Sequence, residues 1–367
     1  MKVALLGASG FVGTRLLECW KLGGGAFEVV PVVRSFSSLA VMARFELPWQ
    51  VCDVMDAPAL AHAFAGCEAV VHAAIGDPSQ IVAMAGSIYQ AAASAGVKRL
   101  VVLSSSSVHG QAPEPGTDET SPLHEKHAMA YNTAKVRAER LLNQLAQDGR
   151  VEVVMLRPSV VFGPRSRWVA DVATQLLDGS ATLIRGGEGL CNTIYVDNLI
   201  HAIERALVVP EAKGEVFLVG DAERVTWREF YAAVAEALGV GMESVRSVEP
   251  PAFPKALKER VGAITSRPAI QKLLPLFPSQ LKRLSKVLLS NWRETPMPNV
   301  WSLPPGTPTA VTEELALLGQ CQWRLPIGKA ERILSYRPPV SFQEGMSRSL
   351  GWLRFAGYPV FDSTQNS

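Results

Sequence analysis

Hydrophobic and polar residues follow two alternating patterns along the first 220 residues of the chain. Short apolar runs rich in valine recur at residues 2–7, 27–34, 68–74, 99–105, 151–158 and 215–220, and residues 47–54 are predicted to add a further strand. Ala- and Leu-rich stretches with apolar residues at helical spacing separate these runs. Apolar strands that alternate with helices are typical of a parallel sheet covered on both faces. The pattern therefore predicts an α/β fold with a doubly wound parallel sheet.

The pattern changes after about residue 220. Residues 226–239 have the spacing of an amphipathic helix, and a proline-rich region follows. Residues 251–294 contain nine Lys or Arg against two Glu. We interpret this stretch as a helical cap with a solvated basic face. The alternative is a surface that contacts an anionic substrate or a lipid headgroup, which would allow membrane contact through residues 255–293.

Composition narrows the class of protein. The formal net charge of the 367 residues is +2, which is too small to indicate nucleic-acid binding or general membrane attraction. The five cysteines are scattered without CxxC spacing, so neither a metal site nor a disulfide framework is predicted. Reduced thiols in a cytoplasmic protein are the simplest interpretation. The N-terminal apolar run is short and leads directly into glycines, unlike a signal peptide, and no run approaches the roughly 20 residues of a membrane span.

A glycine-rich turn, GASGFVG, follows the first apolar run and precedes a helical stretch. Glycine permits a tight turn and lets backbone N–H groups approach a pyrophosphate, which the N-terminus of the next helix also attracts. This context predicts a nucleotide-binding turn. The predicted cofactor contacts are Gly7, Ser9, Gly10, Phe11, Val12 and Gly13.

The ends of the second and third strands bear on the choice of cofactor. Enzymes that prefer NAD usually carry an acid after the second strand, whereas this chain has Arg34 followed by Ser35. A guanidinium suits a 2′-phosphate, which favours NADP(H) and leaves NAD(H) possible. Asp53, followed by Val54, is placed to accept from an adenine amino group. The alternative is that Asp53 caps the next helix.

The run LVVLSSSSVHG ends the fifth strand in serines, at the edge where parallel sheets bind ligands. The stretch YNTAK then places Tyr131 and Lys135 one helical turn apart. A nearby ammonium and an oxidised nicotinamide are expected to lower the pKa of the Tyr131 phenol. Tyr131 is then a candidate acid–base group for a substrate hydroxyl or carbonyl while hydride moves to or from nicotinamide.

Together these motifs resemble the extended short-chain dehydrogenase/reductases, in their epimerase/dehydratase branch. The resemblance covers residues 1–240, through GASGFVG, VVHAA, GVKRLVVLSSSSVHG, YNTAK, LRPSVVFGP and NTIYVDNLIHAI, and the segment 329–354 is similar to the family's closing segment. It implies a Rossmann NAD(P)-binding domain over residues 1–165, to which the strand and helix near 192–220 return. Residues 166–191 and 221–367 then form a smaller, mostly helical substrate-binding part. Its insertion at about 245–320 is unusual for the family.

The resemblance also implies roles for individual residues. Tyr131 is the general acid/base, Lys135 its partner and Ser105 the catalytic serine, with Ser104 and Ser106 as close rivals. Cofactor contacts extend to Ala73, Ala74, Ser104, Tyr131, Lys135, Pro158 and Val160, and the predicted substrate contacts are Ser106, His109, Arg165 and Asn192, with Arg167 in the same segment.

Two departures from the family pattern stand out. His109 replaces a tyrosine found in many members, and we interpret it as a pocket wall or a hydrogen-bonded histidine rather than a second acid–base group. The helix over residues 80–96 lacks the family's Asn near Ile81, which puts the associated proton relay in doubt.

Three functions remain open. The first is an NADP(H)-dependent oxidoreductase that reduces a carbonyl or oxidises a secondary alcohol, acting on a nucleotide sugar or a lipophilic ketone or alcohol. The second is an NAD-dependent nucleotide-sugar epimerase that keeps its cofactor bound. The third is a non-catalytic NADP(H)-binding redox sensor, although such proteins typically lose the Tyr–Lys pair. The resemblance also implies a homodimer formed through the helices that contain IYQAAASAG and AKVRAERLL.

Overall fold

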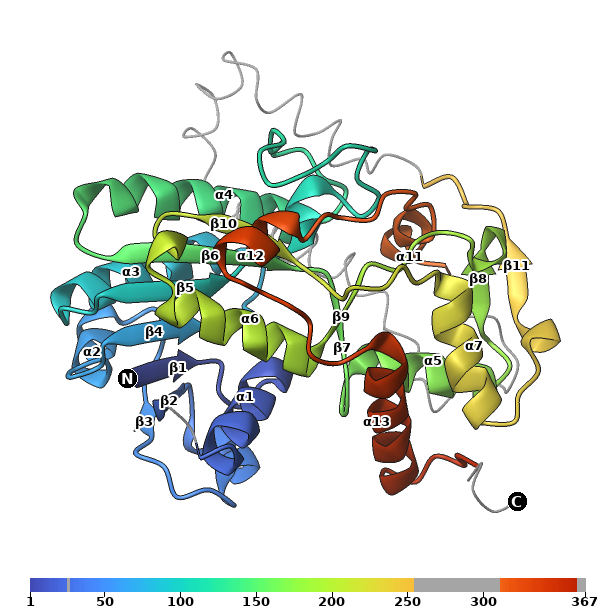
Figure 1. Ribbon diagram of the computed structural model, residues 1–367, viewed down its shortest axis with the longest axis horizontal. Coiled ribbons are helices and arrows are strands. Elements are labelled where there is room, and N and C mark those ends of the chain that lie inside the picture. Colours follow the sequence, from blue (N-terminus) through green and yellow to red (C-terminus); the bar gives the residue numbers. More distant parts are fainter. Residues whose placement is uncertain (25–26, 254–310, 362–367) are drawn as a thin grey trace, which may run out of the picture.

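A seven-stranded parallel sheet forms the centre of the molecule (Figure 1). The computed structural model describes residues 1–24, 27–253 and 311–361. The strand order is β10-β6-β5-β4-β1-β2-β3, so the chain reverses its direction of sheet growth between β1 and β4. The strands are β1 (Lys2–Leu6), β2 (Glu28–Val33), β3 (Gln50–Val51), β4 (Ala69–His72), β5 (Arg99–Leu103), β6 (Glu152–Pro158) and β10 (Val216–Val219). Ligands of doubly wound sheets bind beyond the carboxyl ends of the strands at this reversal.

Helices cover both faces of the sheet, as the continuous apolar strands predict. One apolar cluster packs a face of the sheet against α2 (Ala57–Ala63), α3 (Ile81–Ser94) and α4 (Ala130–Leu145). The other packs the opposite face against α1 (Phe11–Leu22) and α6 (Val196–Val208). The predicted α/β doubly wound fold is therefore confirmed.

In the described residues of the C-terminal half, the strands outside the main sheet form only two-stranded sheets. β10 pairs with β6 at the edge of the main sheet, and α6 packs on its face. Of the remaining elements, α12 (Gly328–Ile333) packs against β10, and most of the others lie beyond the carboxyl ends of the strands (Figure 1). These others are β7 (Val160–Phe162), α5 (Arg167–Leu177), β8 (Thr182–Ile184), β9 (Thr193–Tyr195), α7 (Trp227–Ala237), β11 (Arg246–Val248), α11 (Glu313–Leu318) and α13 (Phe342–Phe355).

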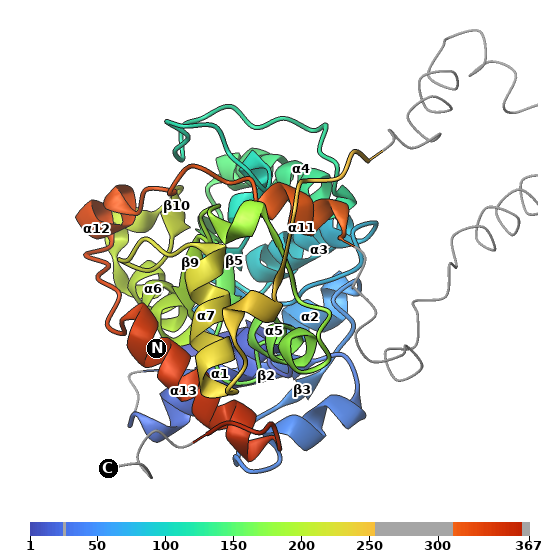
Figure 2. The same ribbon diagram turned by 90° about the vertical axis from the view of Figure 1, so that its right-hand side faces the viewer.

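A buried carboxylate joins this part to the sheet. Asp221, just after β10, accepts hydrogen bonds from the Thr193 hydroxyl at 2.9 Å, the Tyr195 backbone N–H at 2.9 Å and the Asn198 amide at 2.7 Å. Burial raises the pKa of Asp221. Asn198 also pairs with both backbone groups of Val340, which holds the segment before α13 in place. In Figure 2, α13 lies beside α7, with which it packs.

Some of the predictions from the sequence concern segments at the limit of the described residues. The strand predicted within residues 47–54 is present as the two-residue β3 at the sheet edge. Of the predicted insertion at 245–320, only residues 245–253 and 311–320 are described, and the basic segment 255–293 lies outside the described residues. Among the helices that are described, none is long and apolar enough to cross a membrane.

Candidate active site

One large cavity runs along the carboxyl ends of the central strands, with a volume of about 880 Å³. This volume lies in the range of cofactor and small-molecule sites. Most residues predicted from the sequence line it, namely Gly7, Ser9, Gly10, Phe11, Val12, Arg34, Asp53, Val54, Ala73, Ala74, Ser104, Ser105, Ser106, Tyr131, Lys135, Pro158, Val160, Arg165 and Asn192, together with Arg167. Gly13, Ser35 and His109 do not line it.

The glycine turn is packed too closely for side chains. Gly7 has φ +82°, and a Cβ there would lie 2.5 Å from the backbone nitrogen of Ala74. The Gly10 N–H donates to the Gly7 carbonyl at 3.0 Å, which closes the turn. A Cβ at Gly13 would lie 2.1 Å from the Gly7 oxygen. Gly13 therefore shapes the turn from inside α1 without lining the cavity.

Arg34 and Asp53 lie at the end of the cavity that β2 and β3 form. The Arg34 side chain is exposed, and Ser38 lines the cavity near it. Ser35 instead bonds the hydroxyls of Ser37 and Ser38 at 2.9 and 3.2 Å, and so supports this loop from outside. Asp53 accepts from the Met55 N–H, whereas the cap of α2 is Asp56, which accepts from Ala59. The alternative role of Asp53 as the helix cap is therefore wrong.

Ser105, Tyr131 and Lys135 converge where β5 ends and α4 begins. The Ser105 side chain hydrogen-bonds the Tyr131 hydroxyl. The Lys135 ammonium donates to the Leu103 carbonyl at 2.8 Å and lies 5.6 Å from the centroid of the Tyr131 ring. All three side chains line the same cavity, so Ser105 at the end of β5 and the Tyr131–Lys135 pair on α4 come together as the sequence predicts.

The pKa of Tyr131 differs from the sequence-based expectation. Burial raises it to about 12, and this effect outweighs the hydrogen bond from Ser105, which favours the phenolate. Tyr131 is therefore a protonated phenol at neutral pH. Lys135 is 5% exposed, and burial lowers the pKa of its ammonium to about 8. Lys135 is not among the groups that shift the Tyr131 pKa, so the expected lowering by the ammonium is not found, and the lowering by an oxidised nicotinamide stays a prediction.

His109 lies behind the serine run, away from the cavity. Its Nε2 accepts from Arg157 at 3.0 Å, and burial followed by the nearby Arg157 charge lowers its pKa to about 4. A neutral, hydrogen-bonded imidazole at this place is not a wall of the cavity. The structure thus does not bring His109 to the predicted substrate position.

The far end of the cavity combines an apolar wall with polar side chains such as Ser159, Asn192 and Glu314. Trp168 of α5, Leu190, Leu318 of α11 and Leu325 line it. Asn192 has both ends of its amide occupied. It donates to the Trp323 carbonyl at 3.0 Å and to the Cys321 sulfur at 3.4 Å, and it accepts from the Leu325 N–H at 3.0 Å. Asn192 therefore fixes the segment that forms this wall.

The two arginines at the rim differ in their partners. Arg165, with φ +72°, donates to Glu18 of α1 at 2.9 Å, and Glu18 also pairs with Arg15 and Arg44. The Arg167 side chain is 90% exposed and lies 3.9 Å from Asp171. Arg165 is thus held by a carboxylate, whereas the Arg167 guanidinium at the cavity rim faces solvent.

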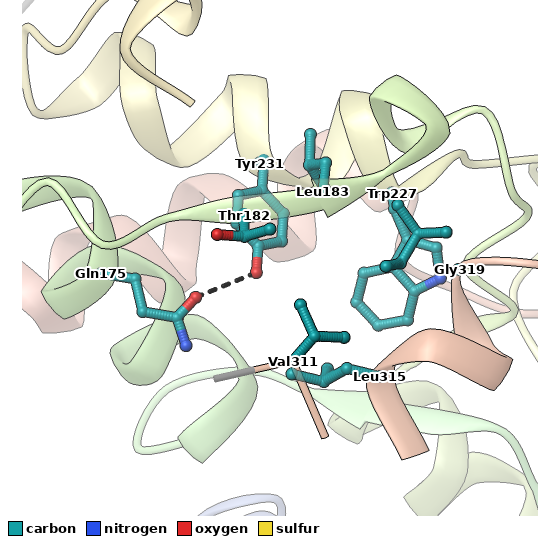
Figure 3. A pocket seen from close by; sticks show the side chains of 9 residues that line it. Gln175, Thr182, Leu183, Trp227, Tyr231, Val311, Leu315 and Gly319 are labelled. Carbon is teal, nitrogen blue, oxygen red and sulfur yellow. Dashed lines mark hydrogen bonds between the residues drawn. The ribbon is translucent and has the colours of Figure 1, made fainter. Parts of the chain in front are cut away.

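Figure 3 shows a second, smaller hollow beside the cavity. Its volume is about 30 Å³, the share of one liquid water, and the Tyr231 hydroxyl donates to Gln175 beside it at 3.1 Å. Helix α11 separates the two spaces, because Glu314 and Leu318 line the cavity while Leu315 lines the hollow.

Several cavity residues were not predicted from the sequence. Ser159, Ser166 and Trp168 lie beside the predicted Pro158, Val160 and Arg165, so their position next to LRPSVVFGP was the available signal. The remaining wall residues Glu314, Leu318 and Leu325 have no such signal. They follow the catalytic helix by more than 160 residues and belong to no motif.

The chain also matches the model of a known protein family. Residues 3–220 match the model of the NAD dependent epimerase/dehydratase family. The chain therefore belongs to the NAD-dependent epimerase/dehydratase family, within the extended short-chain dehydrogenase/reductases, and its cofactor class is NAD(P).

Its relatives catalyse several different reactions. The chain is 27% identical over 252 residues to a UDP-glucose 4-epimerase of Vibrio cholerae. The matched region covers 64% of this chain and 75% of the relative. It is 28% identical over 323 residues to a 3beta-hydroxysteroid-dehydrogenase/decarboxylase of Arabidopsis thaliana, covering 81% and 50% respectively. The fold is similar to a dTDP-glucose 4,6-dehydratase from Streptomyces venezuelae solved with NAD and TYD, with TM-score 0.69, 22% identity and 97% of each chain covered.

Proposed function

We propose that this protein is an NADP(H)-dependent oxidoreductase that reduces a carbonyl group or oxidises a secondary alcohol by hydride transfer. The observation that carries the proposal is a single cavity with Arg34 at one end and Ser105, Tyr131 and Lys135 further along it. Arg34 suits a 2′-phosphate, and the serine, tyrosine and lysine suit proton transfer at a substrate oxygen.

The residues present fit a dinucleotide. Gly7, Ser9 and Gly10 line the cavity at the N-terminus of α1, where backbone N–H groups suit a pyrophosphate. Asp53 has a carboxylate for the adenine amino group, and the Lys135 ammonium is placed for the hydroxyls of the nicotinamide ribose. A bound NADP(H) would supply or accept the hydride.

The chain's own residues would handle the proton and the substrate oxygen. Ser105 would orient that oxygen, and Tyr131 would donate its phenolic proton to it as charge develops. The raised pKa of Tyr131, about 12, keeps this proton in place at neutral pH.

The lining of the far end supports a lipophilic substrate. Trp168, Leu190, Leu318 and Leu325 present apolar surface there, and Arg165 is engaged with Glu18. A ketone or alcohol with a sizeable apolar body fits this wall better than a sugar diphosphate, which needs cations directed at it.

An NAD-dependent nucleotide-sugar epimerase is the second candidate. Relatives that are named epimerases favour it, as do Arg165 and Arg167 at the rim, where they could turn toward a diphosphate. The non-catalytic redox sensor is disfavoured because Tyr131 and Lys135 are both present and lie together. Cytoplasmic location and a homodimer through α3 and α4 remain predictions.

Deuterium transfer tests the proposed reaction. Purified protein would be incubated with NADPH deuterated at C4 and a panel of apolar ketones, and the products analysed by mass spectrometry. We expect one deuterium at the carbinol carbon for each NADPH consumed. Interconversion of UDP-sugars by the protein without added NADPH would contradict the proposal and indicate the epimerase.

A further inference from the structure

A buried carboxylate lies one helical turn beyond the catalytic lysine, and the mechanism above does not use it. Glu139 on α4 is 3% exposed, and so is Arg157 on β6. Arg157 holds Glu139 with two parallel hydrogen bonds, from Nε to Oε1 at 3.0 Å and from Nη2 to Oε2 at 2.7 Å. The Ser104 hydroxyl also donates to Oε1 of Glu139. Fork-shaped pairing of this kind fixes geometry as well as charge.

The pair joins the two segments that form the catalytic centre. Ser104 directly precedes the catalytic Ser105, and His109 ends the short helical turn Ser106–His109 that follows it. Arg157 reaches this turn through Nη1, which donates to His109 Nε2 at 3.0 Å and also contacts the Glu119 carbonyl at 3.4 Å. The serine segment is therefore held on both sides of Ser105 by a pair anchored on the helix of Tyr131 and Lys135.

Charged and titratable groups around this centre are few. The charge of Glu139 favours the Lys135 ammonium, and burial opposes the ammonium more strongly. Burial and the Lys135 charge lower the pKa of the neighbouring His72 to about 3, so His72 is neutral. Around His109, Asp118 and His127 act besides Arg157. Glu139 is thus the acid whose charge stabilises the protonated lysine.

We propose that Glu139 is the positioning residue of the catalytic centre, which locks the serine segment to the helix of Tyr131 and Lys135 and places a compensating negative charge behind Lys135. Arg157 keeps the carboxylate aimed, and His109 supports Arg157 from the far side. This gives His109 a role that needs no contact with substrate. The inference rests on the proposed catalytic use of Tyr131 and Lys135.

The test measures the titration of Lys135 directly, without substrate. Protein labelled with [¹⁵N]lysine would be titrated by NMR of the side-chain Nζ, with the Lys135 signal assigned by its loss in Lys135→Met. In Glu139→Gln the amide keeps the shape and removes the charge. We expect the proton affinity of Lys135 to fall by about tenfold in this variant, because an uncompensated Arg157 then remains nearby.

Two further variants separate positioning from folding. Glu139→Gln with Arg157→Met leaves no unpaired buried charge, and we expect a Lys135 proton affinity between those of the wild type and Glu139→Gln. Glu152→Gln is the matched control, because Glu152 begins the same strand and pairs with Arg99 at 2.8 Å, at the opposite end from Arg157. It is expected to lower the melting temperature and leave the titration of Lys135 unchanged.

An unchanged Lys135 titration in folded Glu139→Gln, with only a lower melting temperature, would overturn the proposal. Failure of the double variant to fold would overturn it as well, since the pair would then serve the fold alone. Because the titration needs neither substrate nor cofactor, its outcome stays distinct from that of the deuterium experiment, which tests the proposed function.

Discussion

The two ends of the cavity are built from the chain in different ways. The cofactor end comes from successive strand–turn–helix units between Gly7 and Lys135, where most lining residues lie at or shortly after the end of a strand. The substrate end combines three distant segments, residues 158–168, 190–192 and 314–325. Its geometry depends on long-range contacts such as those of Asn192 with the segment from Cys321 to Leu325. Local motifs thus define the chemistry, while tertiary packing defines the specificity.

The largest expected effect lies where the two ends meet. Tyr131→Phe removes the proton donor and keeps the ring, so we expect kcat to fall by about 10³-fold. NADPH affinity, measured by fluorescence titration, should stay within about threefold, because the loss is confined to the transition state. If Tyr131→Phe turned over as fast as the wild type, Tyr131 would not be the acid–base group.

A change in the glycine turn is expected to disturb the cofactor end alone. Gly13→Ala places a Cβ 2.1 Å from the Gly7 oxygen, so the turn must open. We expect the free energy of unfolding to fall by about 1–3 kcal/mol and NADPH affinity to fall by up to about 100-fold. Gly351→Ala is the control. A Cβ at Gly351 in α13 meets nothing within 4 Å, so this change should stabilise by about 0.4–1 kcal/mol. Equal changes in unfolding free energy and NADPH affinity in the two variants would contradict close packing at Gly13.

Arg34 is expected to set cofactor preference. Loss of a charge-assisted hydrogen bond costs about 1.5–3 kcal/mol, so Arg34→Glu should weaken NADPH binding by about 10- to 100-fold and leave NADH binding intact or stronger. Arg167→Glu makes the same change of charge at the other end of the cavity. The ratio of NADPH to NADH affinity should not change in that control, and a parallel change would assign the preference to overall charge.

The smallest expected effect concerns the substrate wall. Asn192→Ala frees the segment from Cys321 to Leu325, so we expect KM for an apolar ketone to rise by about tenfold with NADPH affinity unchanged. The exposed Asn143→Ala on α4 serves as the control. A fall in NADPH affinity in Asn192→Ala would show that the two ends of the cavity are coupled, and would contradict their separate construction.

This contrast also explains how far sequence reasoning reached. The strands, the glycine turn and the Tyr–Lys pair follow local rules of periodicity and spacing, so residues such as Gly7, Arg34 and Tyr131 were found in the cavity where strand ends predict them. His109 was misplaced, because its neighbour Arg157 lies 48 residues away and no local pattern encodes their contact. The effect of burial on the Tyr131 pKa was not predicted for a related reason, since burial is a property of the assembled site. Leu318 and Leu325 reach the cavity only through tertiary packing.

The central claim is that the protein exchanges NADP(H) at each turnover. The most direct measurement takes protein purified without added nucleotide, releases any bound nucleotide for identification by mass, and titrates the protein with NADPH and NADH by fluorescence. The account predicts protein free of nucleotide that binds NADPH much more tightly than NADH. Stoichiometric, tightly held NAD would contradict it, and the NAD-dependent epimerase would then be the better description.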